Sequence, residues 1–535
     1  MKRFLFGSLE VLIWGGWGEI GGNQILLSTP EGGLLLDFGK PFGRYGAYFT
    51  DFLGPRDRLG LRDLLFLRIL PPVPGLYRKG DGDTLFPSPL EEDLLRQRAE
   101  EEGVGVDGEG IQALLLSHAH LDHSGALGYL RQDLAVVATA ATAAIAKAMQ
   151  DIGQSRVDGE VTYLSPRTAN VEGVLEGDRK VYRRRPFRLV WGGLPGASGR
   201  SPAKTKPLDG PPWSTVSIPI PLGPFRVEAF PVDHSIPGAC AFSVDTPEGL
   251  VVYTGDLRRH GRWNSHTEAF LRAMERREVF LLLVEGTRLG SQGPARTEVE
   301  VRENLHDLLD QHPGAPIVVD FAPRNLERLL STLEVAEDLR RNLVVTPKDA
   351  YLLWGLGEVD ALWAGVLRRV LVLKEAKARR DGWEEVLWGE APLDTVSMEE
   401  IARDPGAYLL ALGFYDIQRL LDLRLLEDRL GRKRQTGVYV FSNSYWADQE
   451  QILDLGVLLN WLGTLDFRFY PEALASPPQG AVELDNPYHT SGHAPEGDLV
   501  EVVRRLKPRY LIPVHTERPG RWREVVEESV RVLLI

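Results

Sequence analysis

The sequence predicts an α/β protein in which a second α/β domain is inserted into the first. Short apolar runs alternate with helical patterns over most of the 535 residues. The alternation of strand and helix patterns becomes regular between residues 290 and 480, and the earlier, less regular pattern returns after residue 480. Buried strands that alternate with amphipathic helices are typical of sheets covered by helices.

The first part, residues 1–289, is expected to be rich in strands. Helical patterns cover residues 126–131 and 140–150. Residues 246–249, Thr-Pro-Glu-Gly, lie between two strand patterns and predict a hairpin. The apolar runs that predict buried strands are residues 25–27, 34–37, 113–116, 225–232, 241–244, 250–253 and 280–284.

Two segments of this first part do not follow the pattern. Residues 41–110 are rich in Pro and Gly and end in a charged helix at residues 91–102. Residues 155–221 contain three consecutive arginines and a stretch rich in Gly, Ser and Pro. Both are predicted to be surface excursions, because long segments without periodicity are rarely part of a core.

The second part, residues 290–480, predicts a separate domain with a parallel sheet, because helices and strands alternate regularly there. Residues 481–535 then close the first domain, with strands at residues 510–514 and 530–535. The predicted helices of the insert are residues 297–309, 325–341 and 448–462, and its predicted strands are residues 317–320, 343–346, 408–412 and 438–441.

Composition excludes several classes of protein. Lys and Arg number 62 against 75 Asp and Glu, so the formal charge is −13. This balance excludes a chain that coats nucleic acid by bulk charge, although a local basic groove stays compatible with it. Cys240 is the single cysteine, which excludes an internal disulfide and a cysteine-based zinc site. No apolar run approaches the roughly 18 residues of a membrane span, so we expect a soluble, cytoplasmic protein.

The strongest local signal is the sequence SHAHLDHSG at residues 117–125, between a predicted strand and a helix. His118, His120, Asp122 and His123 place three imidazoles and a carboxylate within six residues. Imidazole is a zinc ligand, and a carboxylate can serve a second ion. Further candidate ligands follow other predicted strands, namely His234, Asp256 and His515. Each of these three alone could be structural, but together they would complete a site for two metal ions.

These motifs resemble the metallo-β-lactamase superfamily. The HxHxDH loop, His234 and the sequence Thr-Gly-Asp256 carry that resemblance. Glu285, His493 and His515 resemble motifs A, B and C of its β-CASP branch, and residues 489–493 and 506–515 resemble the bacterial ribonuclease J family. The resemblance implies an αββα sandwich with an inserted β-CASP α/β domain.

The resemblance also implies the metal ligands and the activity. His118, His120 and His234 would hold one zinc ion, and Asp122, His123 and His515 the other, with Asp256 bridging them. Manganese is an alternative metal, because mixed sites of histidine and carboxylate also suit it. The implied enzyme is a zinc-dependent phosphodiesterase that hydrolyses single-stranded RNA with a two-zinc-activated hydroxide and leaves a 5′-phosphate. Cutting from the 5′ end and cutting internally both remain open.

Other residues receive supporting roles on the same pattern. Asp122 is expected to be catalytic, and His493, held by Glu285, is the expected proton donor to the departing oxygen. Asp37 is expected to orient a metal-bound histidine, the alternative being a carboxylate in a turn. Ser491 and His493 are expected to bind the phosphate next to the cut.

Basic clusters are the expected RNA contacts, with solvated charge runs as the alternative. They comprise Arg183, Arg184 and Arg185 in one cluster and Arg432 and Arg434 in the other.

Three alternatives stay open. A histidine at motif C accompanies RNA substrates in this family, so His515 disfavours a DNA nuclease of the same fold. A small-molecule hydrolase would need neither the inserted domain nor the pair Glu285 and His493. A catalytically silent RNA-processing subunit would not need a complete set of metal ligands. A homodimer and a larger processing complex are both compatible with the sequence, and no membrane partner is expected.

Overall fold

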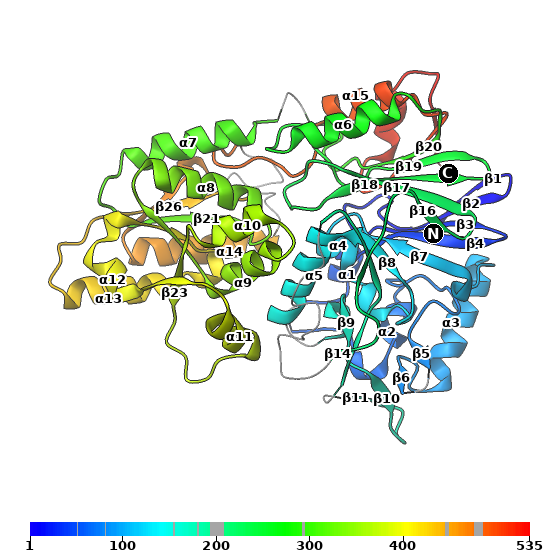
Figure 1. Ribbon diagram of the computed structural model, residues 1–535, viewed down its shortest axis with the longest axis horizontal. Coiled ribbons are helices and arrows are strands. Elements are labelled where there is room, and N and C mark those ends of the chain that lie inside the picture. Colours follow the sequence, from blue (N-terminus) through cyan, green and yellow to red (C-terminus); the bar gives the residue numbers. More distant parts are fainter. Residues whose placement is uncertain are drawn as a thin grey trace. The chain divides into compact units, whose positions relative to one another are not determined.

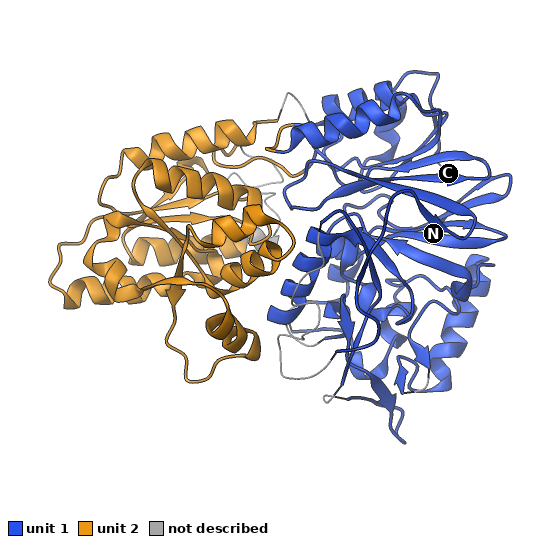
Figure 2. Ribbon diagram, viewed as in Figure 1, with its two compact units in different colours: residues 1–259, 263–293, 493–535 blue, residues 260–262, 294–492 orange. Residues whose placement is uncertain are grey.

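The computed structural model describes residues 1–50, 52–80, 82–153, 156–178, 181–192, 208–291, 295–444, 449–475 and 485–534 (Figure 1). The chain divides into two compact units (Figure 2). Unit 1 comprises residues 1–259, 263–293 and 493–535, and unit 2 comprises residues 260–262 and 294–492.

The division differs from the predicted domain boundaries at both ends of the insert. Residues 290 and 291 belong to unit 1, and residues 485–492 belong to unit 2. The other predicted boundary, residue 480, lies outside the described residues.

Unit 1 contains two large sheets. The first sheet has the strand order β1-β2-β3-β4-β7-β8-β13-β15, and the second has the order β16-β17-β18-β19-β20-β28-β29. The strands of the first sheet are β1 (Lys2–Phe6), β2 (Leu9–Gly15), β3 (Gln24–Thr29), β4 (Gly32–Phe38), β7 (Ile111–Leu115), β8 (Val136–Thr139), β13 (Phe187–Val190) and β15 (Ser214–Thr215). Those of the second are β16 (Ile220–Leu222), β17 (Phe225–Pro231), β18 (Cys240–Thr246), β19 (Gly249–Tyr253), β20 (Val279–Val284), β28 (Tyr510–Pro513) and β29 (Arg531–Val532).

The two sheets face each other across one apolar core. Leu27 and Leu36 of the first sheet and Phe242 and Leu281 of the second are fully buried in the same cluster. Fully burying a side chain of this size contributes roughly 1.5–3 kcal/mol, so this layer supplies much of the stability of unit 1.

A second apolar cluster covers the other face of the second sheet. There Val252 and Leu282 pack with Phe270 of α6 (Asn264–Met274) and Leu499 of α15 (Glu496–Leu506). Helix α5 (Ala140–Ile152) packs on β8 and β13 of the first sheet. The predicted αββα sandwich is therefore confirmed.

Several predicted elements differ in detail. Residues 126–131 do not form an α-helix; a single 3₁₀ turn, Leu127–Tyr129, is present instead. The predicted strand at 530–535 is reduced to Arg531–Val532. The hairpin around residues 246–249 is present, because β18 and β19 pair in antiparallel register.

The segments predicted as surface excursions contribute to the core. Strand β13, within residues 155–221, pairs in parallel with β8, and Phe187 is buried. Leu61 and Leu64, within residues 41–110, are also buried, next to and within α2 (Arg62–Phe66). Helix α3 (Pro89–Glu102) begins at a capping box formed by Ser88 and Glu91, which satisfies backbone donors at its first turn. Most of the Gly/Ser/Pro-rich stretch lies outside the described residues.

Unit 2 is built on one parallel sheet with the order β24-β23-β22-β25-β21-β26-β27. Its strands are β21 (Ile317–Asp320), β22 (Asn342–Val345), β23 (Leu371–Lys374), β24 (Asp394–Ser397), β25 (Tyr408–Ala411), β26 (Gly437–Phe441) and β27 (Phe467–Tyr470). Its helices are α7 (Glu298–Asp310), α8 (Leu326–Asp338), α9 (Pro347–Gly357), α10 (Ala361–Leu367), α11 (Gly382–Glu390), α12 (Met398–Arg403), α13 (Arg419–Arg429) and α14 (Gln449–Thr464). Every strand pairing in this sheet is parallel, so the predicted inserted α/β fold is confirmed.

Among the described residues, no helix is both long enough and apolar enough to cross a membrane.

Candidate metal centre

The candidate ligands of unit 1 lie on segments that follow strands of both sheets. The loop after β7 carries His118 and His120, and the short helix α4 (Leu121–Ser124) carries Asp122 and His123. His120 is the residue that precedes α4, and its carbonyl accepts the backbone N–H of His123 at 3.1 Å. This tight turn brings the side chains of Asp122 and His123 close to those of His118 and His120. The remaining ligands follow β17 (His234), β19 (Asp256) and β28 (His515).

These side chains form two groups whose ligand atoms lie within 4.8 Å of one another. The first group comprises His118, His120 and His234. The Nδ1 atom of His120 lies 3.0 Å from Nε2 of His118 and 3.2 Å from Nε2 of His234. Three ring nitrogens therefore face one point, as expected for ligands of a single ion.

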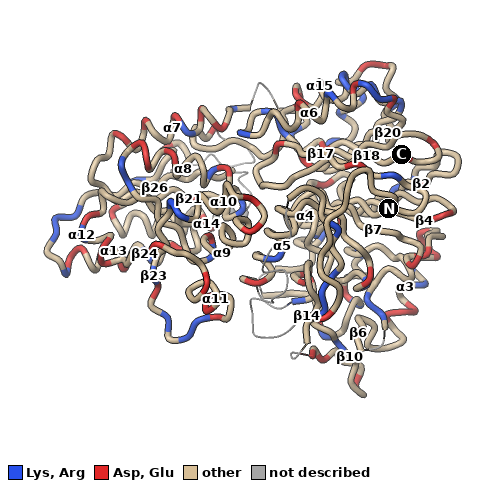
Figure 3. Tube along the Cα trace, viewed as in Figure 1, with Lys and Arg blue, Asp and Glu red and all other residues tan. Residues whose placement is uncertain are grey.

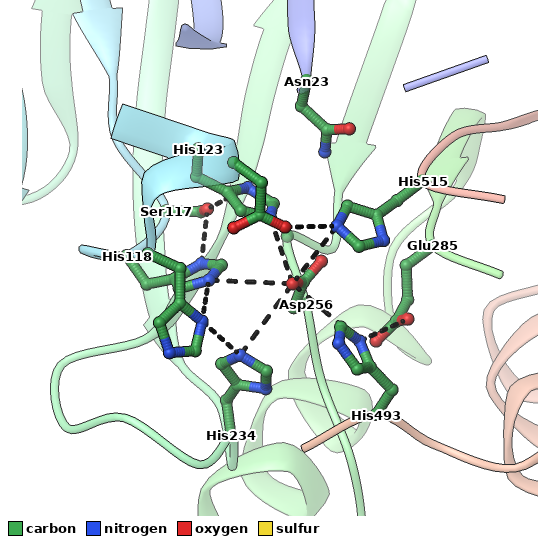
Figure 4. A network of polar contacts seen from close by, with 12 residues as sticks. Asn23, Ser117, His118, His123, His234, Asp256, Glu285, His493 and His515 are labelled. Atoms are coloured by element: carbon green, nitrogen blue, oxygen red, sulfur yellow. Dashed lines mark hydrogen bonds and ion pairs between the residues drawn. The ribbon is translucent and has the colours of Figure 1, made fainter. Parts of the chain in front are cut away.

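The second group comprises Asp122, His123, Asp256 and His515. The Nε2 atom of His515 lies 3.1 Å from Oδ2 of Asp122, and Nε2 of His123 lies 3.0 Å from Oδ2 of Asp256. The same Asp256 oxygen is 3.6 Å from Nε2 of His118. Asp256 thus lies between the two groups, at the centre of the cluster in Figure 4. The Asp256 carboxylate therefore lies where a ligand that bridges two metal ions would have to lie.

The chemistry of these residues fits zinc or a similar divalent ion. Imidazole and carboxylate groups are its ordinary ligands when no cysteine takes part. Oδ1 of Asp256 is buried and takes part in no hydrogen bond with any described residue. Buried polar atoms of native proteins normally have a partner, and a metal ion would supply it.

The charge states of the ligands differ. Burial alone would lower the pKa of His123, but Asp256, Asp122 and Asp37 outweigh it and hold that pKa well above its usual range, so this ring must release a proton to bind a metal. Burial, together with the neighbouring histidines, holds the pKa of His118 well below its usual range, so its ring is neutral and able to bind a metal. Burial alone would raise the pKa of Asp256, but His123 and His515 outweigh it and hold that pKa well below the usual range. The bridging carboxylate is therefore ionised.

Asp37 determines which ring nitrogen of two histidines carries the proton. Its Oδ2 atom lies 2.7 Å from Nδ1 of His123 and accepts the hydroxyl of Ser117 at 2.7 Å. Because the Ser117 hydroxyl donates to Asp37, its oxygen can only accept from Nδ1 of His118, which is 3.0 Å away. Both rings are thus protonated on Nδ1 and present Nε2 to the metal groups. The contacts of Asp37 with His123 and Ser117 are compatible with the orienting role, which stays a prediction.

Two further hydroxyl groups support the site and were not predicted. Tyr253 donates to Oδ2 of Asp37 at 2.6 Å, and Thr287 lies 2.7 Å from Nδ1 of His515. Both residues stand inside or beside motifs that the sequence made visible, since Tyr253 precedes Thr-Gly-Asp and Thr287 follows Glu285. The sequence patterns did not predict a role for these two hydroxyl groups, because only the folded structure brings them close to a ligand or to Asp37.

His493 and Glu285 lie beside the second group. Nδ1 of His493 is 3.0 Å from Oε2 of Glu285 and 3.8 Å from Oδ2 of Asp256. Burial alone would lower the pKa of His493, but Glu285 and Asp256 raise it to about 9. The His493 ring is therefore protonated at neutral pH. The geometry also allows Glu285 and His493 to act as ligands with Asp256 and His515.

The predicted RNA contacts of unit 1 are not an exposed basic cluster. Arg185 is fully buried, and its guanidinium donates to the carbonyls of Val161, Leu127, Leu130 and Arg131. The prediction that Arg185 contacts RNA is therefore wrong, because a buried group with its donors occupied cannot reach a phosphate.

The two other arginines of this cluster differ in exposure. Arg184 is also buried, and its guanidinium donates to the carbonyl of Gly210 at 3.3 Å. Arg183 is half-buried. Of the three arginines, Arg183 alone is not buried, and its contact with RNA stays a prediction.

The two arginines of unit 2 that were predicted to contact RNA are exposed, but both form hydrogen bonds within the protein. Arg434 pairs with Asp428 at 2.8 Å, and Arg432 donates to the carbonyl of Arg403. Ser491 also belongs to unit 2, where its carbonyl lies 2.9 Å from Nε2 of His260. In Figure 3, basic and acidic residues are interspersed along both units. The RNA contacts at Arg183, Arg432, Arg434 and Ser491 thus stay predictions.

Comparisons with known proteins agree with this architecture. Residues 83–269 match the family model described as the metallo-beta-lactamase superfamily, and residues 485–520 match a Zn-dependent metallo-hydrolase RNA specificity domain. A crystal structure of a protein of unknown function from Enterococcus faecalis V583 superposes with a TM-score of 0.63 at 21% identity and covers 98% of each chain. That likeness shows the fold.

Curated relatives are named ribonuclease J. The protein from Mycolicibacterium smegmatis is 23% identical over 423 residues, covering 78% of this chain and 59% of that protein. The protein from Helicobacter pylori strain 26695 is 20% identical over 520 residues, covering 95% of this chain and 56% of that protein. The chain spans less than two thirds of the length of these relatives. With the motif residues gathered as described, the chain is thus similar to the metallo-β-lactamase superfamily over residues 83–269, to the RNA specificity domain of Zn-dependent metallo-hydrolases over residues 485–520, and to proteins named ribonuclease J over most of its length.

Proposed function

We propose that the protein is a metal-dependent ribonuclease that hydrolyses phosphodiester bonds of single-stranded RNA. One observation carries the proposal: seven candidate ligand side chains form two adjoining groups. Asp256 of the second group lies 3.6 Å from His118 of the first, and His493 lies 3.8 Å from Asp256. The RNA specificity domain matched at residues 485–520, which contains His493 and His515, supports RNA as the substrate. The names of the curated relatives support it as well.

In the proposed mechanism, His118, His120 and His234 would hold one ion, and the second group would hold the other. Divalent ions bound there would supply an activated water and would offset negative charge on the phosphate. Asp256 orients both groups, since its carboxylate lies between them. The products are expected to carry 5′-phosphates, as in the family.

His493 is the proposed acid that protonates the departing 3′-oxygen. Glu285 holds its ring through Nδ1 and favours the charged form, and a positioned acid of this kind typically contributes 10²–10⁴-fold, roughly. If His493 is instead a metal ligand, His493→Gln will lower the metal content. If it is the acid, the variant keeps both ions and loses turnover.

The deciding experiment compares hydrolysis of matched single-stranded RNA and DNA that carry a 5′-monophosphate. Protein loaded with zinc or manganese is tested beside Asp122→Ala and beside Asp133→Ala, an exposed carboxylate in unit 1 that serves as control. We expect RNA cleavage that is lost only in Asp122→Ala. A ladder of products separates internal cutting from trimming, and circular RNA is cut only by an endonuclease. Cleavage of neither strand by the loaded protein would refute the proposal.

A further inference from the structure

Thr267, on helix α6, joins two segments of the chain that carry candidate metal ligands. Its hydroxyl oxygen accepts the backbone N–H of Asp233 at 2.9 Å, and the hydroxyl donates to the carbonyl of Arg258 at 2.9 Å. Asp233 immediately precedes His234, and Arg258 follows Asp256 by two residues. A side chain outside both ligand groups therefore links the segment of His234 to the segment of Asp256.

The two segments also contact each other directly. The Arg258 N–H donates to the carbonyl of Asp233 at 2.8 Å, and the two residues form an isolated antiparallel bridge. Their side chains add an ion pair, in which Nε of Arg258 lies 3.4 Å from Oδ1 of Asp233. Asp233 and Thr267 are fully buried, and Arg258 is 1% exposed. Because hydrogen bonds are stronger in such surroundings than in water, these three residues form a clamp between the segments.

The clamp joins segments whose strands are not neighbours in the sheet. His234 follows β17 and Asp256 follows β19, and β18 pairs with both strands and lies between them. Neighbouring strands lie about 4.8 Å apart, so β17 and β19 run roughly 10 Å apart. A backbone contact between Asp233 and Arg258 therefore requires the two segments to converge beyond the ends of their strands, which the strand pairing alone does not impose.

Apolar packing holds each part of the clamp in place. Val232 and Leu257 each directly precede a clamp residue, and Phe270 lies three residues after Thr267 on α6. All three apolar side chains are buried in the same cluster, on the face of the second sheet that α6 covers. Because protein interiors are close-packed, the clamp residues have little freedom to move apart.

His234 is the ligand of the first group whose position depends on the clamp. His118 and His120 lie two residues apart on one loop, whereas His234 comes from a different segment. Its Nε2 atom lies 3.2 Å from Nδ1 of His120 and 3.9 Å from Oδ2 of Asp256 (Figure 4). A ligand has to be held within about 0.5 Å of its productive position, so the placement of His234 determines how tightly the first group can bind an ion.

We propose that the clamp positions His234 and thereby sets the affinity of the first group for its metal ion. The inference rests on the proposed function, in which this group binds one of two ions. Residues that orient a metal ligand typically change metal affinity by roughly 10–100-fold. The second group should be affected less, because Asp122, His123 and His515 lie on other segments.

The test compares Thr267→Val with Thr267→Ser in the full chain. Valine has nearly the shape of threonine, but it removes the acceptor of the Asp233 N–H and the donor to the Arg258 carbonyl, whereas serine keeps both. Competition with a chromophoric chelator measures the affinity for zinc. We expect Thr267→Val to bind the ion of the first group roughly 10–100-fold more weakly, and Thr267→Ser to stay within about threefold of the unchanged protein.

Two background variants assign the change in affinity to one group. Asp122→Ala/His515→Ala lacks two ligands of the second group, so its remaining ion reports on the first group. His120→Ala lacks a ligand of the first group and reports on the second. Adding Thr267→Val should weaken zinc binding in the first background and change it by less than about threefold in the other. Equal losses in both backgrounds would overturn the proposal, because they would indicate a general loss of structure.

Two further variants serve as the control and as a milder test. Thr332→Val is the matched control, because Thr332 is a buried threonine of unit 2 whose hydroxyl donates to a backbone carbonyl at 2.7 Å; it should leave the zinc affinities unaltered. Asp233→Asn keeps the backbone bridge and weakens only the ion pair, so it should lower the affinity of the first group by roughly 2- to 10-fold. If Thr267→Val does not fold, unaltered zinc binding in Asp233→Asn would refute the proposal.

Metal affinity keeps this proposal apart from the proposed function. Cleavage of RNA by the unchanged protein, with unaltered zinc affinity in a folded Thr267→Val protein, would refute the clamp alone. Two bound ions without RNA cleavage would refute the proposed function, and the chelator competition would still decide the role of the clamp. Absence of zinc from the first group of the unchanged protein would refute both. A loss confined to the first group and restored by Thr267→Ser is the supporting result.

Discussion

Replacing Asp37 by asparagine should weaken metal binding in both groups, although Asp37 is not itself a ligand. The carboxylate is fully buried and accepts four hydrogen bonds from three residues. Oδ1 accepts from the Ser117 backbone N–H at 2.7 Å, and Oδ2 faces the Ser117 hydroxyl, His123 and Tyr253 at 2.6–2.7 Å. An amide has one acceptor oxygen, so its NH₂ group must face at least one of these donors.

The cost follows from the better of the two amide orientations. If the asparagine oxygen takes the Oδ2 position, only the Ser117 N–H loses its acceptor, at about 1–3 kcal/mol. The three remaining hydrogen bonds also become weaker, because hydrogen bonds to a charged group are roughly twice as strong as those between neutral groups. We therefore expect a loss of about 2–4 kcal/mol in the free energy of unfolding of the metal-free protein.

The effect on metal affinity is more diagnostic. Asp37 sets the Nδ1–H form of His123 directly and that of His118 through Ser117. Loss of such a partner typically weakens metal binding by roughly 10–100-fold. In Asp37→Asn both ions should be affected, whereas Ser117→Ala should weaken mainly the ion held by the group of His118.

Competition with a chromophoric chelator measures both affinities, and guanidinium unfolding measures stability. Asp320→Asn in unit 2 is the matched control, because it makes the same change at a buried carboxylate outside the ligand groups. It should leave the metal affinities unaltered. A folded Asp37→Asn protein that binds two ions within about threefold of the unchanged affinity would refute the tautomer argument.

Three further predictions concern stability. Arg185→Leu should lower the free energy of unfolding by about 3–5 kcal/mol in chemical denaturation, because four carbonyl groups lose their buried donor. The salt dependence of RNA binding should not change in this variant. A weaker salt dependence would show that Arg185 does contact a phosphate. Burial raises the pKa of Asp320 to about 6, against hydrogen bonds from Tyr439 and Asn443 that lower it. The folded state therefore holds this proton more tightly than the unfolded state, so its stabilising contribution is complete below about pH 4 and is lost as the pH rises through about 6. That loss, about 2–3 kcal/mol, should be absent in Asp320→Asn, and identical pH profiles of unfolding would contradict the assignment. Finally, removing metal with a chelator should lower the thermal midpoint and adding zinc should restore it, since ions bound only by the folded state stabilise it; equal midpoints in calorimetry would argue against metal binding at the two groups.

The sequence by itself determined the fold class and the ligand types. Strand and helix periodicities are local properties, so the strands that precede His234, Asp256 and His515 could be placed without a structure. The HxHxDH motif spans six residues, so its histidine and aspartate side chains must lie close together in any short turn. Local patterns were less reliable where burial depends on distant neighbours. Residues 126–131 carry a helical pattern yet form a single 3₁₀ turn.

Only the tertiary structure decided which polar groups act together. The Ser117 hydroxyl lies 80 residues from Asp37, and the Tyr253 hydroxyl lies 216 residues from it, a separation that no sequence pattern encodes. The same holds for Arg185, whose run of three arginines was interpreted as an RNA contact, with a solvated charge run as the alternative. Arg185 is fully buried, and the packing around it, not its charge, determined that its donors face buried carbonyl groups. The types of the candidate metal ligands can therefore be predicted from the sequence. The protonation of these ligands and the surfaces next to them depend on contacts that form only on folding.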